Sequence, residues 1–119
     1  MRHDVIAFLT NVAERVDPAA RHIHKGMTSS DVVDTALSVN LVKAADLLLA
    51  DVDRVRAAAA KQARKHAFTP MIGRSHGIHA EPTTFGLKMA LMVDEFGRAL
   101  ARLKTARETV RAGDRKSVV

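Results

Sequence analysis

The chain has 119 residues, a formal net charge of +6, 47% hydrophobic and 27% charged residues, and no cysteine. This length fits one small domain or part of a larger one, and the lack of cysteine excludes disulfide scaffolds and thiolate metal sites. No apolar run approaches the roughly 18 residues of a membrane span, so we expect no membrane partner. The absence of cysteine suits a reducing cytosol, and we expect a cytoplasmic location.

The first expected element is a short amphipathic helix that ends before Pro18. The residue before a proline is biased away from helical geometry, which sets this boundary. The apolar positions recur at helical spacing, and they are Val5, Phe8, Leu9, Val12 and Val16. Residues 17–30 then read as a connector, with Gly26 and the hydroxyl cluster Thr28-Ser29-Ser30.

A long helix is expected from near Asp31 to about Lys65, because this stretch contains no glycine or proline. Thr28 and Asp31 have the spacing of a capping box, and an acidic residue suits the positive end of the helix dipole. Apolar residues recur along this helix with a period near 3.5, the pattern of a helix-bundle seam. These residues are Leu41, Ala45, Leu48, Val52, Val55 and Ala59.

Residues 67–82 are rich in glycine and proline and read as a second loop, after which Thr83 and Thr84 can cap a third helix. The seam of this helix again alternates steps of four and three, through Phe85, Met89, Met92, Phe96, Ala99, Leu103, Ala106 and Val110. We therefore expect an all-α fold, with two long helices of a central bundle and a short N-terminal helix. Two seams of this length need further partner helices.

Polar residues gather in three short stretches outside the seams, at residues 2–4, 24–31 and 73–84. Each lies at a helix start or in a loop that leads into one, where free backbone N–H groups hold carboxylate or phosphate oxygens. Arg2 and Arg74 can pair with such anions through two hydrogen bonds, and histidine supplies a proton near neutral pH. Together these residues suit a multi-anionic substrate and a proton transfer.

Each stretch also has a simpler interpretation. The hydroxyls of residues 28–30 can cap a helix without contacting a ligand. His66, at a helix C-terminus, can simply interact favourably with the helix dipole. The pairs His22–His24 and His76–His79 consist of residues that can bind a metal ion. Neither pair has a carboxylate at a spacing known from metal sites. We therefore expect no metal and no cofactor, and the functional interpretation depends on all three stretches together.

The charge is uneven, with −3 over residues 1–53 and +9 over residues 54–119. A basic C-terminal half is compatible with nucleic-acid binding, as in a non-catalytic helical interaction module. A solvated helix face is favoured instead, because the positive residues are spread along helices without aromatic side chains to stack on bases. We expect no nucleic-acid partner, and the interaction module stays as an alternative.

Three motifs carry a resemblance to a known family: RHDVIAF, HKGMTSSDVVDTA and GRSHGIHAEPTTFG. In this order and spacing they resemble the adenylosuccinate lyases of the fumarase/aspartase superfamily, from Arg2 to about Gly113. The third motif is shared across much of the superfamily, whereas the first two are narrower. A carboxymuconate cycloisomerase, the alternative within the superfamily, would be expected to carry TSQD at residues 28–31, where this chain reads TSSD.

The resemblance implies an activity in purine biosynthesis. The family enzyme releases fumarate from adenylosuccinate, giving AMP, and from the related succinyl carboxamide ribotide. By motif, His76 matches the proton-donating catalytic histidine, Thr28 and Ser29 match residues that hold the succinyl carboxylates, and His24 matches a second active-site histidine near the phosphate. The nucleotide-binding segment of the family matches Arg2, His3 and Asp4.

The resemblance also implies an assembly, a homotetramer in which each site draws on three subunits. It divides this chain into residues 1–28, the end of an N-terminal helical domain, and 29–119, the truncated first part of the central bundle domain. The family's mobile loop with the base serine is not in this sequence, so we expect the 119-residue chain by itself to be inactive. After Gly113 the family continues with a Gly- and Ser-rich stretch, whereas residues 114–119 read DRKSVV. We expect these to be a tail unrelated to the family.

Overall fold

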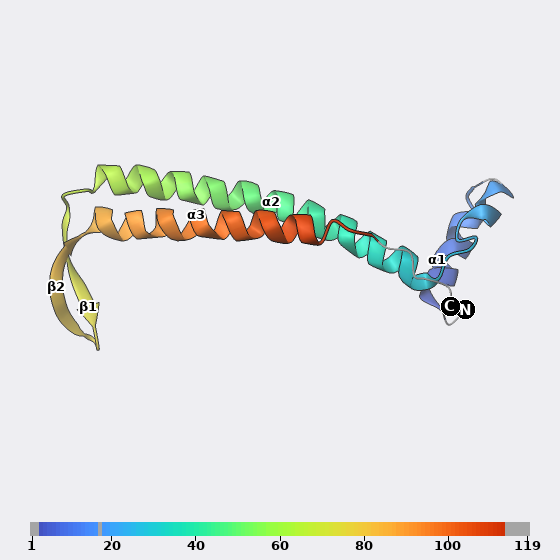
Figure 1. Ribbon diagram of the computed structural model, residues 1–119, viewed down its shortest axis with the longest axis horizontal. Helices are drawn as coiled ribbons and strands as arrows, with labels where there is room; N and C mark the ends of the chain where they lie inside the picture. Colours follow the sequence, from blue (N-terminus) through green and yellow to red (C-terminus); the bar gives the residue numbers. More distant parts are fainter. Residues whose placement is uncertain (1–2, 17, 114–119) are drawn as a thin grey trace. The chain divides into compact units, whose positions relative to one another are not determined.

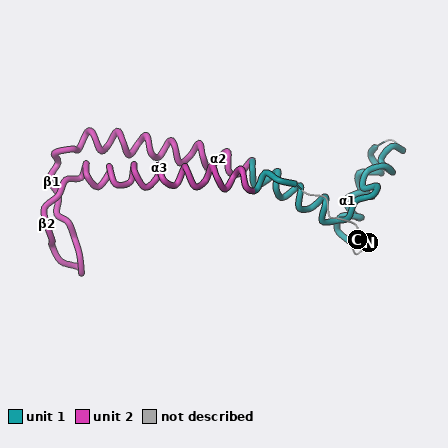
Figure 2. Tube along the Cα trace, viewed as in Figure 1, with its two compact units in different colours: residues 1–42, 110–119 teal, residues 43–109 magenta. Residues whose placement is uncertain are grey.

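The computed structural model describes residues 3–16 and 18–113. In chain order (Figure 1) the described elements are α1 (Asp4–Ala13), the 3₁₀ helix η1 (Pro18–His22), α2 (Ser29–Lys65), β1 (Pro70–Ser75), β2 (Ile78–Thr84) and α3 (Phe85–Thr109). The expected helical architecture, with one short and two long helices, is confirmed. Two compact units are distinguished in Figure 2: the described parts of residues 1–42 and 110–119, and residues 43–109.

In the first unit, α1 buries Val5, which is 6% exposed, and ends at Ala13 rather than near Val16. The long helix α2 begins at Ser29, two residues before the expected start, and ends at Lys65 as expected. Its capping box is half formed, because the Thr28 N–H donates to Asp31 Oδ2 at 2.8 Å. Asp31 is only 7% exposed, so this buried carboxylate fixes the direction in which the chain enters α2.

In the second unit, α3 runs antiparallel beside α2, as Figure 1 shows. Contacts at three levels fix the register. Gly86 lies against the His66 carbonyl, a Cβ at Gly97 would lie 3.6 Å from Arg56 Nε, and Arg107 Nε donates to Asp46 Oδ1 at 2.6 Å. Two helices of this kind bury one stripe each and leave their other faces open.

The expected seam of α2 is correct at alternate positions only. Ala45 and Ala59 are buried, at 8% and 7% exposed, whereas Leu48 and Val55 are 51% and 45% exposed. Leu41 is also exposed. The face toward α3 runs instead through half-buried Leu49 and Ala63. The apolar residues of α2 lie on more than one side of the helix, and α3 covers only one of these sides. On α3 the expected seam positions from Phe85 to Leu103 are half-buried. In the next turn Arg107 is half-buried, whereas the expected Ala106 is exposed.

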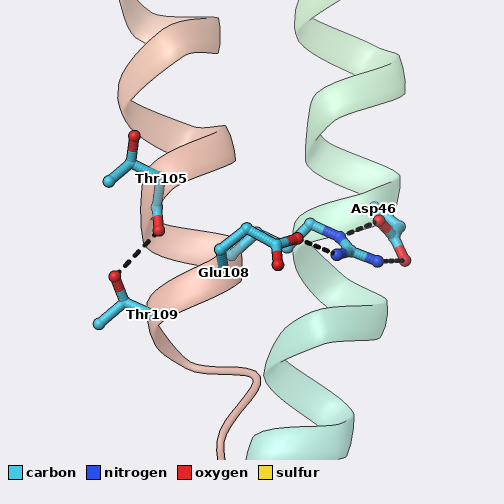
Figure 3. A network of polar contacts seen from close by, with 5 residues as sticks. Asp46, Thr105, Glu108 and Thr109 are labelled. Atoms are coloured by element: carbon cyan, nitrogen blue, oxygen red, sulfur yellow. Dashed lines mark hydrogen bonds and ion pairs between the residues drawn. The ribbon is translucent and has the colours of Figure 1, made fainter.

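One polar network ties the two long helices together within the second unit (Figure 3). The Arg107 guanidinium donates to both carboxylate oxygens of Asp46, at 2.6 and 3.2 Å, and to Glu108 Oε1 at 2.7 Å. The hydrogen bond from Arg107 lowers the pKa of Asp46 below its usual range. A two-pronged pair of this kind selects one register of α3 on α2, since a shift by one turn would break both bonds.

The expected second loop is wrong: residues 70–84 form an antiparallel β-hairpin. Pro70 pairs with Thr84 at its base and Ser75 with Ile78 at its tip. A two-stranded ribbon has two open edges, so Pro70 and Pro82 fit without the loss of a ladder hydrogen bond. Thr84 caps α3, because its Oγ1 accepts from the Leu87 N–H at 3.1 Å.

Candidate active site

The tip of the hairpin is a two-residue turn made by His76 and Gly77. Their φ angles are +51° and +74°, the left-handed combination that type I′ turns require and that matches the twist of the flanking strands. Glycine adopts such a φ freely, whereas a histidine does so at some cost in energy. The turn places His76 at the outermost point of the hairpin, where its side chain is exposed. Within the described residues, nothing hydrogen-bonds to its imidazole.

A β-bulge lies between Ile72 and Arg74, where the pairing of the two strands shifts register. A Cβ at Gly73 would come within 2.8 Å of the Glu81 carbonyl oxygen, so this close approach of the strands requires glycine. Beyond the bulge Arg74 lies opposite His79. The bulge therefore resets which face carries Arg74, and it brings a cationic side chain and a second imidazole together near His76.

In the first unit the structure brings together His3 and Ser29, two expected site residues 26 positions apart in the chain. His3 caps α1, accepting from the Ile6 N–H at Nδ1 over 3.5 Å, and its Nε2 lies 3.3 Å from Ser29 Oγ. Which of the two atoms, His3 Nε2 or Ser29 Oγ, donates depends on the ring tautomer. The first and second polar stretches of the sequence thus meet at one place.

His24 has two unusual features. Its φ is +76°, in the left-handed region, and its half-buried ring has a buried Nε2 without a hydrogen-bond partner in the described part of the chain. A strained backbone and an unpaired buried nitrogen each cost free energy. Such costs are typical of groups held ready for a ligand, so His24 is the strongest single candidate for ligand contact in this unit.

The remaining expected site residues have simpler surroundings. Asp4 begins α1, its Oδ1 accepts from the Val5 N–H at 2.8 Å, and its side chain is 87% exposed. The Thr28 backbone is used in the cap of α2, while its hydroxyl makes no hydrogen bond among the residues that the structure describes. Arg2 lies outside the described residues. His76 belongs to the other compact unit.

The described residues contain neither a metal-binding cluster nor a membrane-spanning helix. No group of three or more His, Cys, Asp or Glu side chains there is arranged to hold a metal ion. No helix in that part of the chain combines the length and apolar character needed to cross a membrane. The donor set that is present consists of imidazoles, hydroxyls and helix N-termini, which suit an anionic organic substrate.

The sequence itself is similar to that of known proteins. The family model described as "Lyase" matches residues 1–117, so the chain belongs to this lyase family. Its similar curated relatives are adenylosuccinate lyases, 51% identical over 113 residues in Synechocystis, 50% over 112 in Aquifex aeolicus and 48% over 112 in Bacillus subtilis. These matches cover 94–95% of this chain and 26% of each relative, so the chain spans about a quarter of their length.

Solved structures show the same superfamily. A fumarate lyase from Mesorhizobium sp. BNC1 matches with a TM-score of 0.86 and 32% identity over 96% of this chain and 27% of that one. A 3-carboxy-cis,cis-muconate lactonizing enzyme from Pseudomonas putida matches with a TM-score of 0.78 and 38% identity, over 89% of this chain and 24% of that one. The expected membership of the superfamily is thereby confirmed.

Proposed function

We propose that this chain supplies part of the active site of an adenylosuccinate lyase, which releases fumarate from adenylosuccinate and from the succinyl carboxamide ribotide of purine biosynthesis. The observation that carries this proposal is 48–51% identity to three adenylosuccinate lyases over nearly the whole chain. Identity to the muconate-lactonizing enzyme is lower, at 38%, and the TSSD sequence at residues 28–31 favours the same choice.

In this reaction a base removes a proton from the carbon beside a carboxylate, and the bond between the neighbouring carbon and the nitrogen breaks. The electron pair of the C–H bond becomes the double bond of fumarate, and the pair of the C–N bond stays on the nitrogen. His76 gives its proton to that nitrogen, so that a neutral amine leaves. The exposed turn at the hairpin tip supports this role, because it leaves the imidazole free to approach a bound substrate.

The residues of the first unit bind the substrate in this proposal. Thr28 and Ser29 hold the succinyl carboxylates with their hydroxyls and with the free N–H groups at the start of α2. His24 uses its unpaired Nε2 on the phosphate, and Arg2, His3 and Asp4 form the nucleotide-binding segment. The contact between His3 and Ser29 supports this division, since it links the nucleotide and succinyl ends of the site.

The assembly belongs to the proposal as well. We infer a cytoplasmic homotetramer for the complete enzyme, in which each active site draws on several subunits. The His76 imidazole has no orienting partner among the described residues, which supports a site completed by other parts of the assembly. No residue of this chain is assigned the role of the base.

A chimeric enzyme tests the proposal. The matched segment of the Bacillus subtilis relative is replaced by this chain, and cleavage of adenylosuccinate is followed by absorbance. We expect turnover that is lost in the His76→Gln variant, with little activity on 3-carboxy-cis,cis-muconate. A folded chimera that acts on the muconate and not on adenylosuccinate would show that the substrate class is wrong.

A further inference from the structure

The base of the β-hairpin is closed by a compact set of hydrogen bonds. The Thr69 N–H and the Gly86 N–H both donate to the His66 carbonyl oxygen, at 3.1 and 2.9 Å, and the Phe85 N–H donates to the Thr69 carbonyl at 2.9 Å. A carbonyl at the C-terminal end of α2 thus accepts from an N–H in the first turn of α3. Neither this carbonyl nor this N–H has a hydrogen-bond partner within its own helix, so the end of α2 and the start of α3 satisfy one another.

The backbone of Gly86 packs directly against the backbone of residues 66 and 67, without space for a side chain. A Cβ at Gly86 would lie 2.5 Å from Ala67 Cα and 2.6 Å from the His66 oxygen. Both atoms belong to the backbone, so they cannot turn aside as a flexible side chain would. Thr69 and Phe85, the residues that flank the two strands, are therefore held at a fixed separation.

The His66 side chain contacts both of these flanking residues. Its Nδ1 lies 3.1 Å from Thr69 Oγ1, just before β1, and its ring meets the Phe85 ring edge to face, with centroids 5.2 Å apart at 72°. A histidine whose only role was to oppose the helix dipole would need neither contact. The sequence-based interpretation of His66 as a dipole partner is thus incomplete.

We propose that His66 is a positioning residue for the reaction, acting as a clamp that sets the direction of the hairpin and hence the place of His76. This rests on the proposed function of His76 as the acid. The ring contacts the residues at both ends of the hairpin, and the close approach of Gly86 to His66 and Ala67 holds the start of α3 against the end of α2. Among the described elements, the main contact between the hairpin and α3 is through β2, so the orientation of the hairpin depends strongly on this base.

The length of the hairpin magnifies any looseness at the base. The rise of about 3.3 Å per residue puts the tip roughly 17 Å from Pro70, so a tilt of about 5° would move His76 by roughly 1.5 Å. Misplacement of a catalytic group by about 1 Å can cost a hundredfold in rate. Loss of the clamp should therefore lower kcat by about 10- to 100-fold, with KM little changed, because substrate binding depends on residues of the other unit.

Variants at position 66 in the chimeric enzyme test the clamp. His66→Ala removes both contacts, His66→Asn keeps a polar partner for Thr69, and His66→Phe keeps a ring for Phe85. Lys65→Ala is the matched control, because it removes a charge from the same helix end without touching the hairpin. We expect kcat to fall in His66→Ala, to recover in part in His66→Asn or His66→Phe, and to stay unchanged in Lys65→Ala. Normal kcat in a folded His66→Ala enzyme, or an effect on KM alone, would overturn the proposal.

A second measurement is independent of activity. In the 119-residue chain, hydrogen exchange is compared for amides of residues 70–84 and for amides in the middle of α2 and α3. The clamp predicts faster exchange in His66→Ala for the hairpin only, and equal change throughout would show a merely structural role and overturn it. If His76→Gln left the chimera fully active, the proposed acid role of His76 would fail, and the exchange data would still decide whether His66 holds the hairpin.

Discussion

Two histidines of the hairpin occupy different places, and this difference predicts different roles. His76 is in the turn itself, with φ of +51°, whereas His79 lies within β2 opposite Arg74. A side chain at the tip can enter a site formed by other segments, while one on the strand is held beside its cross-strand neighbour. The acid should therefore be His76, and His79 should help to hold the turn or an anion near it.

Kinetics of the chimeric enzyme check this assignment. We expect His76→Gln to lower kcat by roughly 10²–10⁴, the usual contribution of a general acid, with a much smaller effect on KM. His79→Gln should lower kcat far less. The assignment is wrong if the two variants show the reverse order.

The residue types of the site are predictable from sequence, but their contacts are not. The hydroxyls at 28–30 and the histidines at 24 and 76 stand out in polar stretches beside helix starts. The contact of His3 with Ser29 spans 26 residues, and no local pattern predicts which distant residues meet. The unpaired Nε2 of His24 follows from burial, which depends on the folded backbone.

At the scale of elements, the long helices were predictable because their apolar pattern is uninterrupted over many turns. The hairpin was not, because its sequence carries the breakers Pro70, Gly73 and Pro82. A free two-stranded ribbon also buries little of either face, so it needs no alternating apolar pattern. The only local signal is the His76-Gly77 pair, which suits a two-residue turn through its glycine.

Two glycines of α3 give opposite predictions for the same substitution. Gly86→Ala would place a methyl group 2.5 Å from Ala67 Cα, and overpacking of this kind costs about 1–3 kcal/mol or more. At Gly97 the nearest atom is Arg56 Nε at 3.6 Å, so alanine there should stabilise the helix by about 0.5–1 kcal/mol. Urea unfolding of the two variants is the measurement, and equal effects would contradict the close contact at Gly86.

The pair between Asp46 and Arg107 predicts an acid-sensitive contribution to stability. Its hydrogen bond lowers the pKa of Asp46 from an unfolded value of 3.8, so the folded state favours the ionised carboxylate. The contribution is therefore complete above that unfolded value and is lost as the pH falls through the lower folded pKa. Because the Asp46 carboxylate is exposed, the effect should be small and weakened by salt. As the pH is lowered, the melting temperature should fall less in Asp46→Asn than in the wild type. An equal fall in both proteins would contradict this role.

At the scale of the whole molecule, the second unit leaves large apolar side chains uncovered. Leu47 and Leu48 on α2 are 70% and 51% exposed, and Leu87 and Leu91 on α3 are 64% and 60% exposed. The leucines of α3 also line an open cleft of about 850 Å³ beside the hairpin. Exposed apolar patches of this kind drive association in water, and fuller burial would recover about 25 cal/mol for each Å².

We therefore expect the 119-residue chain to self-associate, with a weight-average mass in sedimentation that rises with concentration. The combined variant Leu87→Gln and Leu91→Gln should weaken this association, because it makes the surface polar at an exposed place without changing the net charge. The matched control, Leu87→Met with Leu91→Met, keeps the apolar surface and should associate like the wild type. A folded wild-type monomer whose mass does not depend on concentration would contradict the prediction. Equal weakening by glutamine and methionine would show that the leucine shapes, rather than the exposed apolar area, govern the contact.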